Sequence, residues 1–508
     1  MFSLLLVHID LEYPKIIGDP IHGYVPLTKL EYNMLQLPTL TRLHFIRQNA
    51  LACFVFPGAV TTRFSHVVGA LHTGGKLINQ LLSGISKKDF KILFSDIDPN
   101  LVVKAVRLAC LFHDIGHGPF SHSTEETMLK ITREQHNEEI QEAKILFNET
   151  NENKIPIHEF FSYKLIKNGE INDEICINEG TEKGHILIDF VTSLLIKSKI
   201  NDTLDLQGYS LLRKLISSQL DADRMDYLLR DSFMSGVKFG LVDIDRIIKN
   251  MKIIRSHDGI YNIAIHERAL GTIEDMLDAR YKMYRWFYSH HTVVVLNELL
   301  KIAIDMLIED PTIGKLFHWT EYKNGYSTDD YIISRLIGQT SDEKFGKVKG
   351  LIDRRYLPVS IFKSTPDFAR IVTKVDQKMT IHHDDDTIRK LIIESFKSED
   401  VGTIIKNKLE EDSSLRNCEI FQTQLKMKPY EPLSQKDQIY LYRNEDDNLC
   451  ELLSESRYFK KINEEWTQYH GLYLFYLIPG EKRERFVNLR EGIIEIVTST
   501  IADHIRQT

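Results

Sequence analysis

Apolar residues in this sequence recur mostly every three or four positions, which is the spacing of helices that bury one face. The stretch 101–112 is apolar at nearly every position except Lys104 and Arg107, so it predicts a helix that is buried on most of its circumference. Residues 28–51 carry the same spacing, and Pro38 divides them into two short predicted helices. The pattern as a whole predicts a mainly α-helical protein.

The same spacing predicts further helices, and a different pattern predicts a few strands. Helices are expected from His66 through Leu77 and over residues 156–166, 185–196, 269–308 and 492–505. Alternating apolar and polar residues predict strands at 438–443 and 471–479, and a hairpin over 251–267 that turns at Asp258-Gly259. Residues 168–186 are polar and are expected to form a solvated excursion. No internal repeat is apparent.

Charge, cysteine content and the opening residues argue against several classes of protein. The 508 residues include 64 basic and 72 acidic side chains, a formal charge of −8, which disfavours general nucleic-acid binding. The five cysteines are scattered without a CxxC pair, so we expect neither a disulfide framework nor a zinc ribbon. The opening residues have a short apolar run and no basic segment, which fits neither a signal peptide nor a membrane span. We expect a cytoplasmic protein.

The closest cluster of potential metal-binding and catalytic side chains follows the buried helix at 101–112. His113 and Asp114 stand at its end, Gly116 and Gly118-Pro119 break it, and His117 and His122 lie in the turn. Three imidazoles and a carboxylate within ten residues, delivered by a rigid element into a turn, are hard to explain by packing. The stretch therefore indicates a metal site.

Two other stretches offer the remaining ligands. His66 follows Arg63 and opens a predicted helix, and residues 220–227 place three carboxylates, Asp223 among them, in a helical run. A set of His66, His113, Asp114 and Asp223 contains only nitrogen and oxygen ligands and no thiolate. Such a set suits Mn, Fe, Mg, Ni or Zn and leaves coordination positions for water and substrate, which is typical of a catalytic site.

Four motifs in this order resemble one family. They are GDPIHGYVPL at 18–27, FPGAVTTRFSHVVG at 56–69, HDIGHGPFSH at 113–122 and LDADRMDYLLRD at 220–231. The chain is similar in these motifs to the HD superfamily of metal-dependent phosphohydrolases, and within it to the deoxynucleoside triphosphate triphosphohydrolases. The resemblance covers residues 15–300. It implies a helical HD-domain core with a small β-hairpin, followed by a C-terminal α+β lobe.

The resemblance also implies roles for individual residues. The metal ligands would be His66, His113, Asp114 and Asp223, and the catalytic residues His117, His122, Glu125 and His158. His158 is preferred over His136, which lies in a charged run and is expected on a solvated face. The residues expected to bind substrate are Gln48, Arg63, Arg224, Tyr227, Arg280, Tyr284 and Tyr288. Tyr288 would pack against a deoxyribose and leave no room for a 2′-hydroxyl.

The implied reaction cleaves a deoxynucleoside triphosphate to a deoxynucleoside and inorganic triphosphate. Two alternatives stay open: another HD phosphohydrolase acting on nucleotide mono- or cyclic phosphates, and a nucleotide-binding regulatory subunit. On their pattern alone, Arg280, Tyr284 and Tyr288 also fit an aromatic core stripe. The cluster at 381–386, IHHDDD, is read as an exposed loop or helix start rather than a second metal site.

Domain organisation and assembly are expected by the same resemblance. Residues 1–310 would form the phosphohydrolase core, and residues 311–508 a lobe for oligomer or regulatory contacts. A homo-oligomer with an allosteric nucleotide at subunit contacts is implied. Gln36 and His44, however, stand where the family has the aspartate and arginine that recognise an activating guanine nucleotide, which argues against the same switch.

Overall fold

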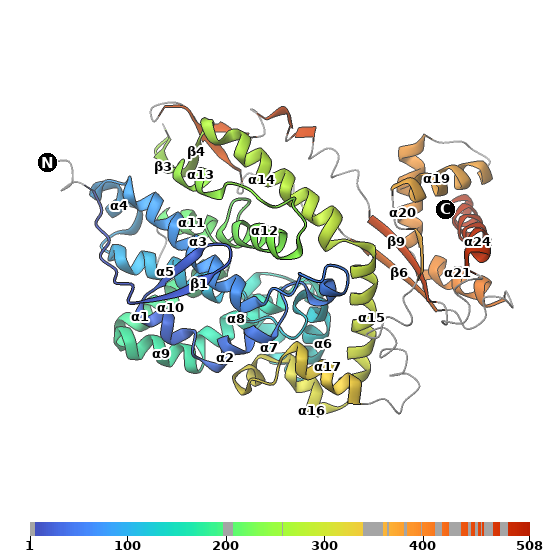
Figure 1. Ribbon diagram of the computed structural model, residues 1–508, viewed down its shortest axis with the longest axis horizontal. Helices are drawn as coiled ribbons and strands as arrows, with labels where there is room; N and C mark the ends of the chain where they lie inside the picture. The colour runs from blue at the N-terminus through green and yellow to red at the C-terminus, as the bar shows by residue number, and fades with distance from the viewer. Residues whose placement is uncertain are drawn as a thin grey trace. The chain divides into compact units, whose positions relative to one another are not determined.

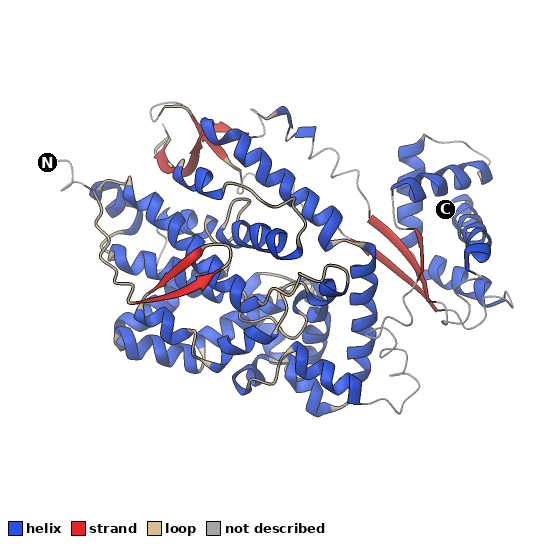
Figure 2. Cartoon of the chain, in the orientation of Figure 1, coloured by secondary structure: helices blue, strands red, loops and turns tan. Residues whose placement is uncertain are grey.

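The computed structural model shows a mainly helical protein with small sheets, as the sequence predicts (Figures 1 and 2). It describes residues 6–196, 207–256, 258–338, 359–362, 365–379, 384–397, 399–411, 419–425, 438–444, 449–452, 456–458, 460–461, 471–477 and 486–507. For the basic stretch 347–359 the sequence predicts a helix followed by a turn, and this stretch lies outside the described residues apart from Val359. Residues 381–383, half of the IHHDDD cluster, also lie outside them. Within the described residues, no helix combines the length and the apolar character needed to cross a membrane.

Two compact units make up the chain. The first comprises residues 1–287, 304–335 and 430–463, and the second comprises residues 288–303, 336–429 and 464–508. This division differs from the predicted boundary at residue 310, because residues 311–335 and 430–463 belong to the first unit. The role of residues 311–508 in oligomer or regulatory contacts stays a prediction.

The first unit is built on helices that pack around α5. α3 packs against α5 and α12, and α10 packs against α5, α8 and α9. Its helices are α1 (Lys29–Met34), α2 (Pro38–Thr41), α3 (Arg63–Ser83), α4 (Lys87–Phe94), α5 (Pro99–Phe112), α6 (Glu125–Gln135), α7 (Asn137–Phe147), α8 (Ile157–Lys167), α9 (Glu170–Glu179), α10 (Thr181–Leu195), α11 (Gln207–Lys214), α12 (Ala222–Ser235), α13 (Ile244–Lys249), α14 (Leu270–Met283) and α16 (Pro311–Gly314). α15 (His291–Leu307) and α17 (Asp329–Gly338) each cross a boundary between the units.

Two small sheets complete this unit. β1 (Lys15–Asp19) and β2 (Gly23–Leu27) pair antiparallel. A second sheet has the order β3-β4-β7-β8, formed by β3 (Met251–Arg255), β4 (Tyr261–His266), β7 (Tyr440–Tyr442) and β8 (Cys450–Glu451). β4 pairs parallel with β7, and the other pairs are antiparallel. The predicted hairpin at 251–267 and the strand at 438–443 are confirmed.

The second unit contains α19 (Thr365–Lys378), α20 (Asp385–Lys397), α21 (Glu399–Glu411) and α24 (Phe486–Gln507). The first three pack against α24 around apolar residues such as Val375, Ile392 and Val497. An antiparallel sheet places β9 (Gly471–Leu477) between β5 (Val359–Phe362) and β6 (Glu419–Leu425). The predicted strand at 471–479 and the predicted terminal helix are both present.

Two sequence-based predictions were wrong. The expected excursion at 168–186 forms α9 and the first turns of α10, because Ile171 and Ile175 are spaced one turn apart and are fully buried. The expected single helix over 269–308 is interrupted by a π-helical turn at Tyr284–Tyr288 and restarts at His291. Within this turn Phe287 is fully buried, with its ring centroid 4.8 Å from that of Phe56.

Candidate metal centre and substrate pocket

Helix ends bring the predicted metal ligands together. α3 begins at Arg63, three residues before the predicted start, where the Thr62 side chain accepts a hydrogen bond from the N–H of Ser65. α5 ends at Phe112, so His113 and Asp114 follow its last turn as predicted. α12 begins after Asp221, whose Oδ1 accepts a hydrogen bond from the Arg224 N–H at 2.7 Å. Each cap fixes the side chains in the adjacent turn.

His66, His113 and Asp114 place ligand atoms within 4.8 Å of one another, and Asp223 faces both imidazoles. The Nε2 atom of His66 lies 3.0 Å from Oδ1 of Asp223 and 3.5 Å from Oδ2 of Asp114. The Nε2 atom of His113 lies 3.5 Å from Oδ1 of each carboxylate. Both Nε2 atoms are buried and have no hydrogen-bond partner among the described residues. Buried imidazole nitrogens that face two carboxylates at these distances fit a divalent cation.

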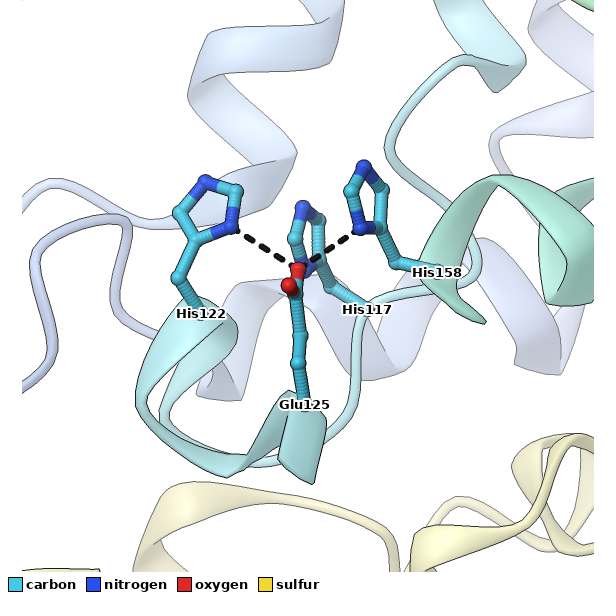
Figure 3. A group of neighbouring side chains, drawn as sticks. All are labelled: His117, His122, Glu125 and His158. Carbon is cyan, nitrogen blue, oxygen red and sulfur yellow. Dashed lines mark hydrogen bonds and ion pairs between the residues drawn. The ribbon is translucent and has the colours of Figure 1, made fainter. Parts of the chain in front are cut away.

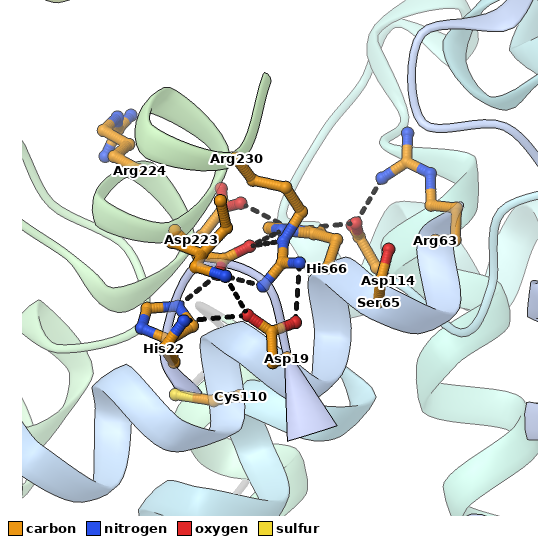
Figure 4. Close-up of polar contacts among 12 residues, drawn as sticks. Asp19, His22, Arg63, Ser65, His66, Cys110, Asp114, Asp223, Arg224 and Arg230 are labelled. Atoms are coloured by element: carbon orange, nitrogen blue, oxygen red, sulfur yellow. Dashed lines mark hydrogen bonds and ion pairs between the residues drawn. The ribbon is translucent and has the colours of Figure 1, made fainter. Parts of the chain in front are cut away.

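A network of buried polar side chains holds His66 from behind. Its Nδ1 atom lies 2.8 Å from Oδ2 of Asp226, a carboxylate that is fully buried. Arg230 donates two hydrogen bonds of 2.8 Å to Asp226 and one of 2.7 Å to Asp19. His22 adds a contact of 2.7 Å from its Nε2 to Asp226. Figure 4 shows His22, Asp19 and Arg230 gathered beside His66. The network holds the His66 ring with Nε2 toward Asp114 and Asp223.

Charges at the centre favour binding of a cation. Burial by itself would lower the pKa of His66, but Asp223 and Asp226 outweigh it and raise that pKa to about 10. Burial also opposes ionisation of Asp223, yet His113 and His66 hold its pKa below the usual value. Likewise, Arg63 outweighs burial and holds the pKa of Asp114 well below its usual range. The carboxylates are therefore ionised at neutral pH, as metal ligands need to be.

A second cluster lies beside the first. The Nδ1 atoms of three histidines face the same Oε1 atom of Glu125, at 2.8 Å for His122, 2.6 Å for His158 and 3.6 Å for His117. The other ring nitrogens of His122 and His158 point away from Glu125 (Figure 3). The rings of His117 and His158 are stacked, with centroids 4.2 Å apart. His117 also joins the two clusters, because its Nε2 atom lies 3.3 Å from Oδ1 of Asp114.

The stacked histidines differ in protonation. Burial lowers the pKa of His117 well below its ordinary value, and the charges of Arg63 and His158 add to that effect. Burial acts in the same direction on His158, but Glu125 outweighs it and raises the pKa to about 9. At neutral pH the pair therefore consists of a neutral and a protonated imidazole. Such a divergence is typical of residues that exchange protons with a substrate.

A cavity of about 760 Å³ joins the two clusters. Eleven of the predicted site residues line it: Gln48, Arg63, His113, Asp114, His122, His158, Asp223, Arg224, Tyr227, Arg280 and Tyr284. His66 and His117 are fully buried beneath its wall, and Glu125 holds two histidines that line it. Tyr288 belongs to the second unit, so its place beside a deoxyribose stays a prediction.

Two arginines that line the cavity each keep a buried donor atom without a partner among the described residues. Arg63 pairs with Asp114 and donates from Nε to Ser121 Oγ at 2.9 Å, while its buried Nη2 has no hydrogen-bond partner among the described residues. Arg280 donates to Gln219 at 2.7 Å, and its Nε is similarly unpartnered within the described chain. These donors suit the oxygens of a phosphate chain.

Sequence reasoning missed part of the site. Lys154 and Arg213 also line the cavity, yet each lies in a stretch whose pattern marks only an ordinary polar surface. Asp226 and Arg230 lie four residues apart within LDADRMDYLLRD, so their ion pair could have been found from the helical spacing. Their contacts with Asp19 required the fold.

Comparison with protein families identifies two matches along the chain. Residues 63–231 match the HD domain, and residues 242–392 match the HD associated region. The first match contains all four predicted metal ligands and the histidine cluster.

Relatives match more than half of this chain. An uncharacterised protein of Mycoplasma pneumoniae is 32% identical over 69% of this chain and 73% of its own length. The human deoxynucleoside triphosphate triphosphohydrolase SAMHD1 is 28% identical over 59% of this chain and 45% of its own length. The chain thus spans about half the length of several curated relatives that it matches. A solved phosphohydrolase structure from Bacteroides thetaiotaomicron shares the fold, with a TM-score of 0.57, 22% identity and coverage of 91% of this chain and 98% of the other.

Proposed function

This chain belongs to the HD domain family, and from that premise we propose that it is a metal-dependent hydrolase that cleaves deoxynucleoside triphosphates to deoxynucleosides and inorganic triphosphate. One observation carries the proposal: unpartnered imidazole nitrogens, a protonated histidine and arginine donors all meet around one cavity. The human relative is named for the same reaction, and the substrate is taken from that likeness.

His66, His113, Asp114 and Asp223 would hold the cation. A divalent metal bound there supplies a Lewis acid for a phosphoryl oxygen and lowers the pKa of water. The fully nitrogen and oxygen ligand set accommodates Mn, Fe, Mg, Ni or Zn, of which manganese is the first to test. The network through Asp226 keeps the His66 ring in place while substrate enters and products leave.

Cationic side chains would position the triphosphate. Arg63 lies beside Asp114, so a phosphate bound by its free Nη2 would sit next to the metal centre. Arg224 and Arg280 line the same cavity and would offset the remaining negative charge. Holding the α-phosphorus against the centre converts the attack of water into a reaction within one complex.

Proton transfer would fall to the histidine cluster. His158 is protonated at neutral pH because Glu125 raises its pKa, so it can donate a proton to the departing nucleoside oxygen. His122 shares the same Glu125 oxygen and lines the cavity, and it would orient water or relay a proton. Gln48, Tyr227 and Tyr284 line the cavity and would contact the nucleoside. Tyr288 is proposed by resemblance as the residue that favours deoxyribose over ribose.

Product analysis tests the proposal. Metal-free protein is reconstituted with Mn(II) or Mg(II), given each deoxynucleoside triphosphate alone and in mixture beside ribonucleotides, and its products are separated by ion-exchange chromatography. We expect deoxynucleoside and inorganic triphosphate in equal amounts. A His113→Ala/Asp114→Ala variant, which lacks two metal ligands, should lose the reaction.

Other products would identify a different activity. Release of phosphate or pyrophosphate would assign the chain to another branch of HD phosphohydrolases. Nucleotide binding without turnover under every mixture would favour a regulatory subunit. Light scattering with and without nucleotide tests the proposed homo-oligomer, and a constant monomer would rule out both the oligomer and an allosteric nucleotide at subunit contacts.

A further inference from the structure

The turn that carries His117 and His122 contains two residues in a strained conformation. Phe120 and Ser121 have φ values of 62° and 56°, in the left-handed region that residues with a Cβ atom rarely adopt. Phe120 is also fully buried. A conformation of this kind persists only when surrounding contacts hold it in place.

Asp329 supplies one such contact from a distant part of the sequence. It is fully buried at the start of α17, outside residues 63–231 and inside the HD associated region. Its Oδ1 accepts a hydrogen bond from the Phe120 N–H at 2.6 Å, and its Oδ2 accepts one from the Arg47 N–H at 2.9 Å. A single carboxylate thus bridges the strained turn and the segment that leads to Gln48.

The two bridged segments also bond to each other through site residues. Ser121 Oγ donates to the Arg47 carbonyl at 2.7 Å and accepts from Arg63 Nε at 2.9 Å. Gln48 is held beside them, because its N–H donates to the Thr61 carbonyl at 2.8 Å. The position of Arg63 relative to the turn therefore depends on the same junction that Asp329 closes.

Arg42 connects the start of the turn, residues 115–117, with residues 322–327, which precede Asp329. Its Nη2 donates to the carbonyls of Ile115 and His117 at 2.6 and 2.8 Å, and its Nη1 lies 3.4 Å from the Ser327 carbonyl. The guanidinium carbon stands 3.6 Å from the centroid of the Tyr322 ring. Two independent side chains thus connect residues 322–329 with the turn.

We propose that Asp329 is a positioning residue for the catalytic turn, which it holds against the Arg47–Arg63 segment so that His122 and Arg63 keep the separation that the reaction needs. The expected loss of turnover rests on the proposed function, whereas the expected loosening of the turn does not. Neither hydrogen bond from Asp329 reaches the cavity, so the residue acts through Phe120 and Arg47. Through Asp329 the HD associated region therefore supports the catalytic turn from outside the cavity, in addition to supplying Arg280 and Tyr284 to the cavity lining.

Hydrogen–deuterium exchange in the metal-loaded full chain tests whether Asp329 holds the turn in place. Asp329→Ala removes both acceptors, and Asp329→Asn keeps the shape but replaces one acceptor with an N–H donor. We expect faster exchange over residues 117–122 and 46–49 in both variants and unchanged exchange in α5. Asp330→Asn is the matched control, because Asp330 is exposed and its carboxylate lies 3.6 Å from Arg47. If Asp329→Ala does not fold, Asp329→Asn decides the result, and unchanged exchange in the turn overturns the proposal.

Steady-state kinetics test whether Asp329 affects turnover. We expect kcat to fall about 100-fold in Asp329→Asn while KM and bound metal stay near the wild-type values, because displacement of the turn disturbs proton transfer more than ground-state binding. Loss of metal or a general rise in KM would point to a merely structural role and would overturn the proposal. If wild-type protein hydrolyses no nucleotide, the proposed function fails, whereas the exchange experiment still decides whether Asp329 holds the turn.

Discussion

The Nδ1 atom of His66 lies 2.8 Å from the buried carboxylate of Asp226, and its Nε2 atom faces Asp114 and Asp223. A single imidazole thus joins a buried ion network on one side to the candidate metal centre on the other. The Asp226 carboxylate holds a hydrogen on Nδ1, so a cation that displaces the Nε2 proton meets a lone pair directed at it.

Replacing Asp226 with Asn should weaken metal binding by roughly 10- to 100-fold, the usual cost of losing a residue that supports a metal ligand. Asn can turn its N–H toward His66 and so favour the wrong imidazole tautomer. Titration calorimetry with Mn(II) measures the dissociation constant. Asp173→Asn, on the exposed face of α9, is the control and should bind metal as wild type does. Equal affinity in Asp226→Asn would show that the network has no influence on the centre.

Glu125→Gln should move the alkaline limb of the pH–rate profile to lower pH. Burial depresses the pKa of His158 and Glu125 raises it to about 9, so removing the carboxylate charge lowers that pKa. The protonated form is the proton donor, and it would then disappear at a pH lower by roughly one to three units. The check is kcat measured from neutral to alkaline pH. Glu126→Gln, on the exposed side of α6, should keep the wild-type profile, and an unshifted limb in Glu125→Gln would exclude His158 as the donor.

The metal ligands were predictable because each lies in a short stretch with its own signal. His113 and Asp114 end an apolar helix, and Asp223 stands in the first turn of another. Asp329 had no such signal, since its partners Arg47 and Phe120 are separated from it by more than two hundred residues. A motif shows which residues a helix presents, whereas a contact of this range depends on the packing of the whole unit.

The same distinction explains the errors in secondary structure. Residues 168–186 are polar in sequence, yet Ile171 and Ile175 suffice to bury one face of α9 against α10. The break at 284–288 lies in a continuous helical pattern, and only the burial of Phe287 distinguishes it. Local pattern therefore located the strongly apolar helices but missed shorter or more polar ones such as α4, α6 and α7.

Gly116→Ala should destabilise the protein by about 1–3 kcal/mol, the usual cost of forcing extra volume into a packed site. A Cβ atom at Gly116 would lie 2.0 Å from the His158 carbonyl oxygen and 2.4 Å from the Ser162 nitrogen, both backbone atoms of α8. Relief of that overlap would push α8, and with it His158, away from Glu125. Chemical denaturation measures the loss, and kcat should fall in the same variant.

Gly271→Ala is the matched control for this substitution. No atom lies within 4 Å of the added Cβ, and the residue is in α14, so stability should stay unchanged or rise by up to about 1 kcal/mol. Equal stability of the Gly116 and Gly271 variants would contradict the close approach of α8 to the HD turn.

Asp329 should give the stability of the protein a specific pH dependence. Burial raises its pKa from 3.8 to about 7, although the N–H groups of Arg47 and Phe120 act to lower it. Arg47 and Arg42 also favour the charged form, and Asp330 opposes it. At a pH between 3.8 and about 7, Asp329 is protonated in the folded chain but ionised in the unfolded chain. The contribution of Asp329 to the free energy of unfolding is therefore complete below about pH 4 and is lost as the pH rises through about 7.

Comparison of wild type with Asp329→Asn isolates this contribution, because the amide does not titrate while the other ionisable groups are shared. The free energy of unfolding, measured by chemical denaturation at a series of pH values, should fall more steeply between pH 4 and 7 in wild type than in the variant. Asp330→Asn removes only the weakest of these influences on the pKa of Asp329 and should keep most of the wild-type slope. A constant difference between wild type and Asp329→Asn would mean that Asp329 ionises normally, and the buried bridge between Phe120 and Arg47 would then have to be open to water.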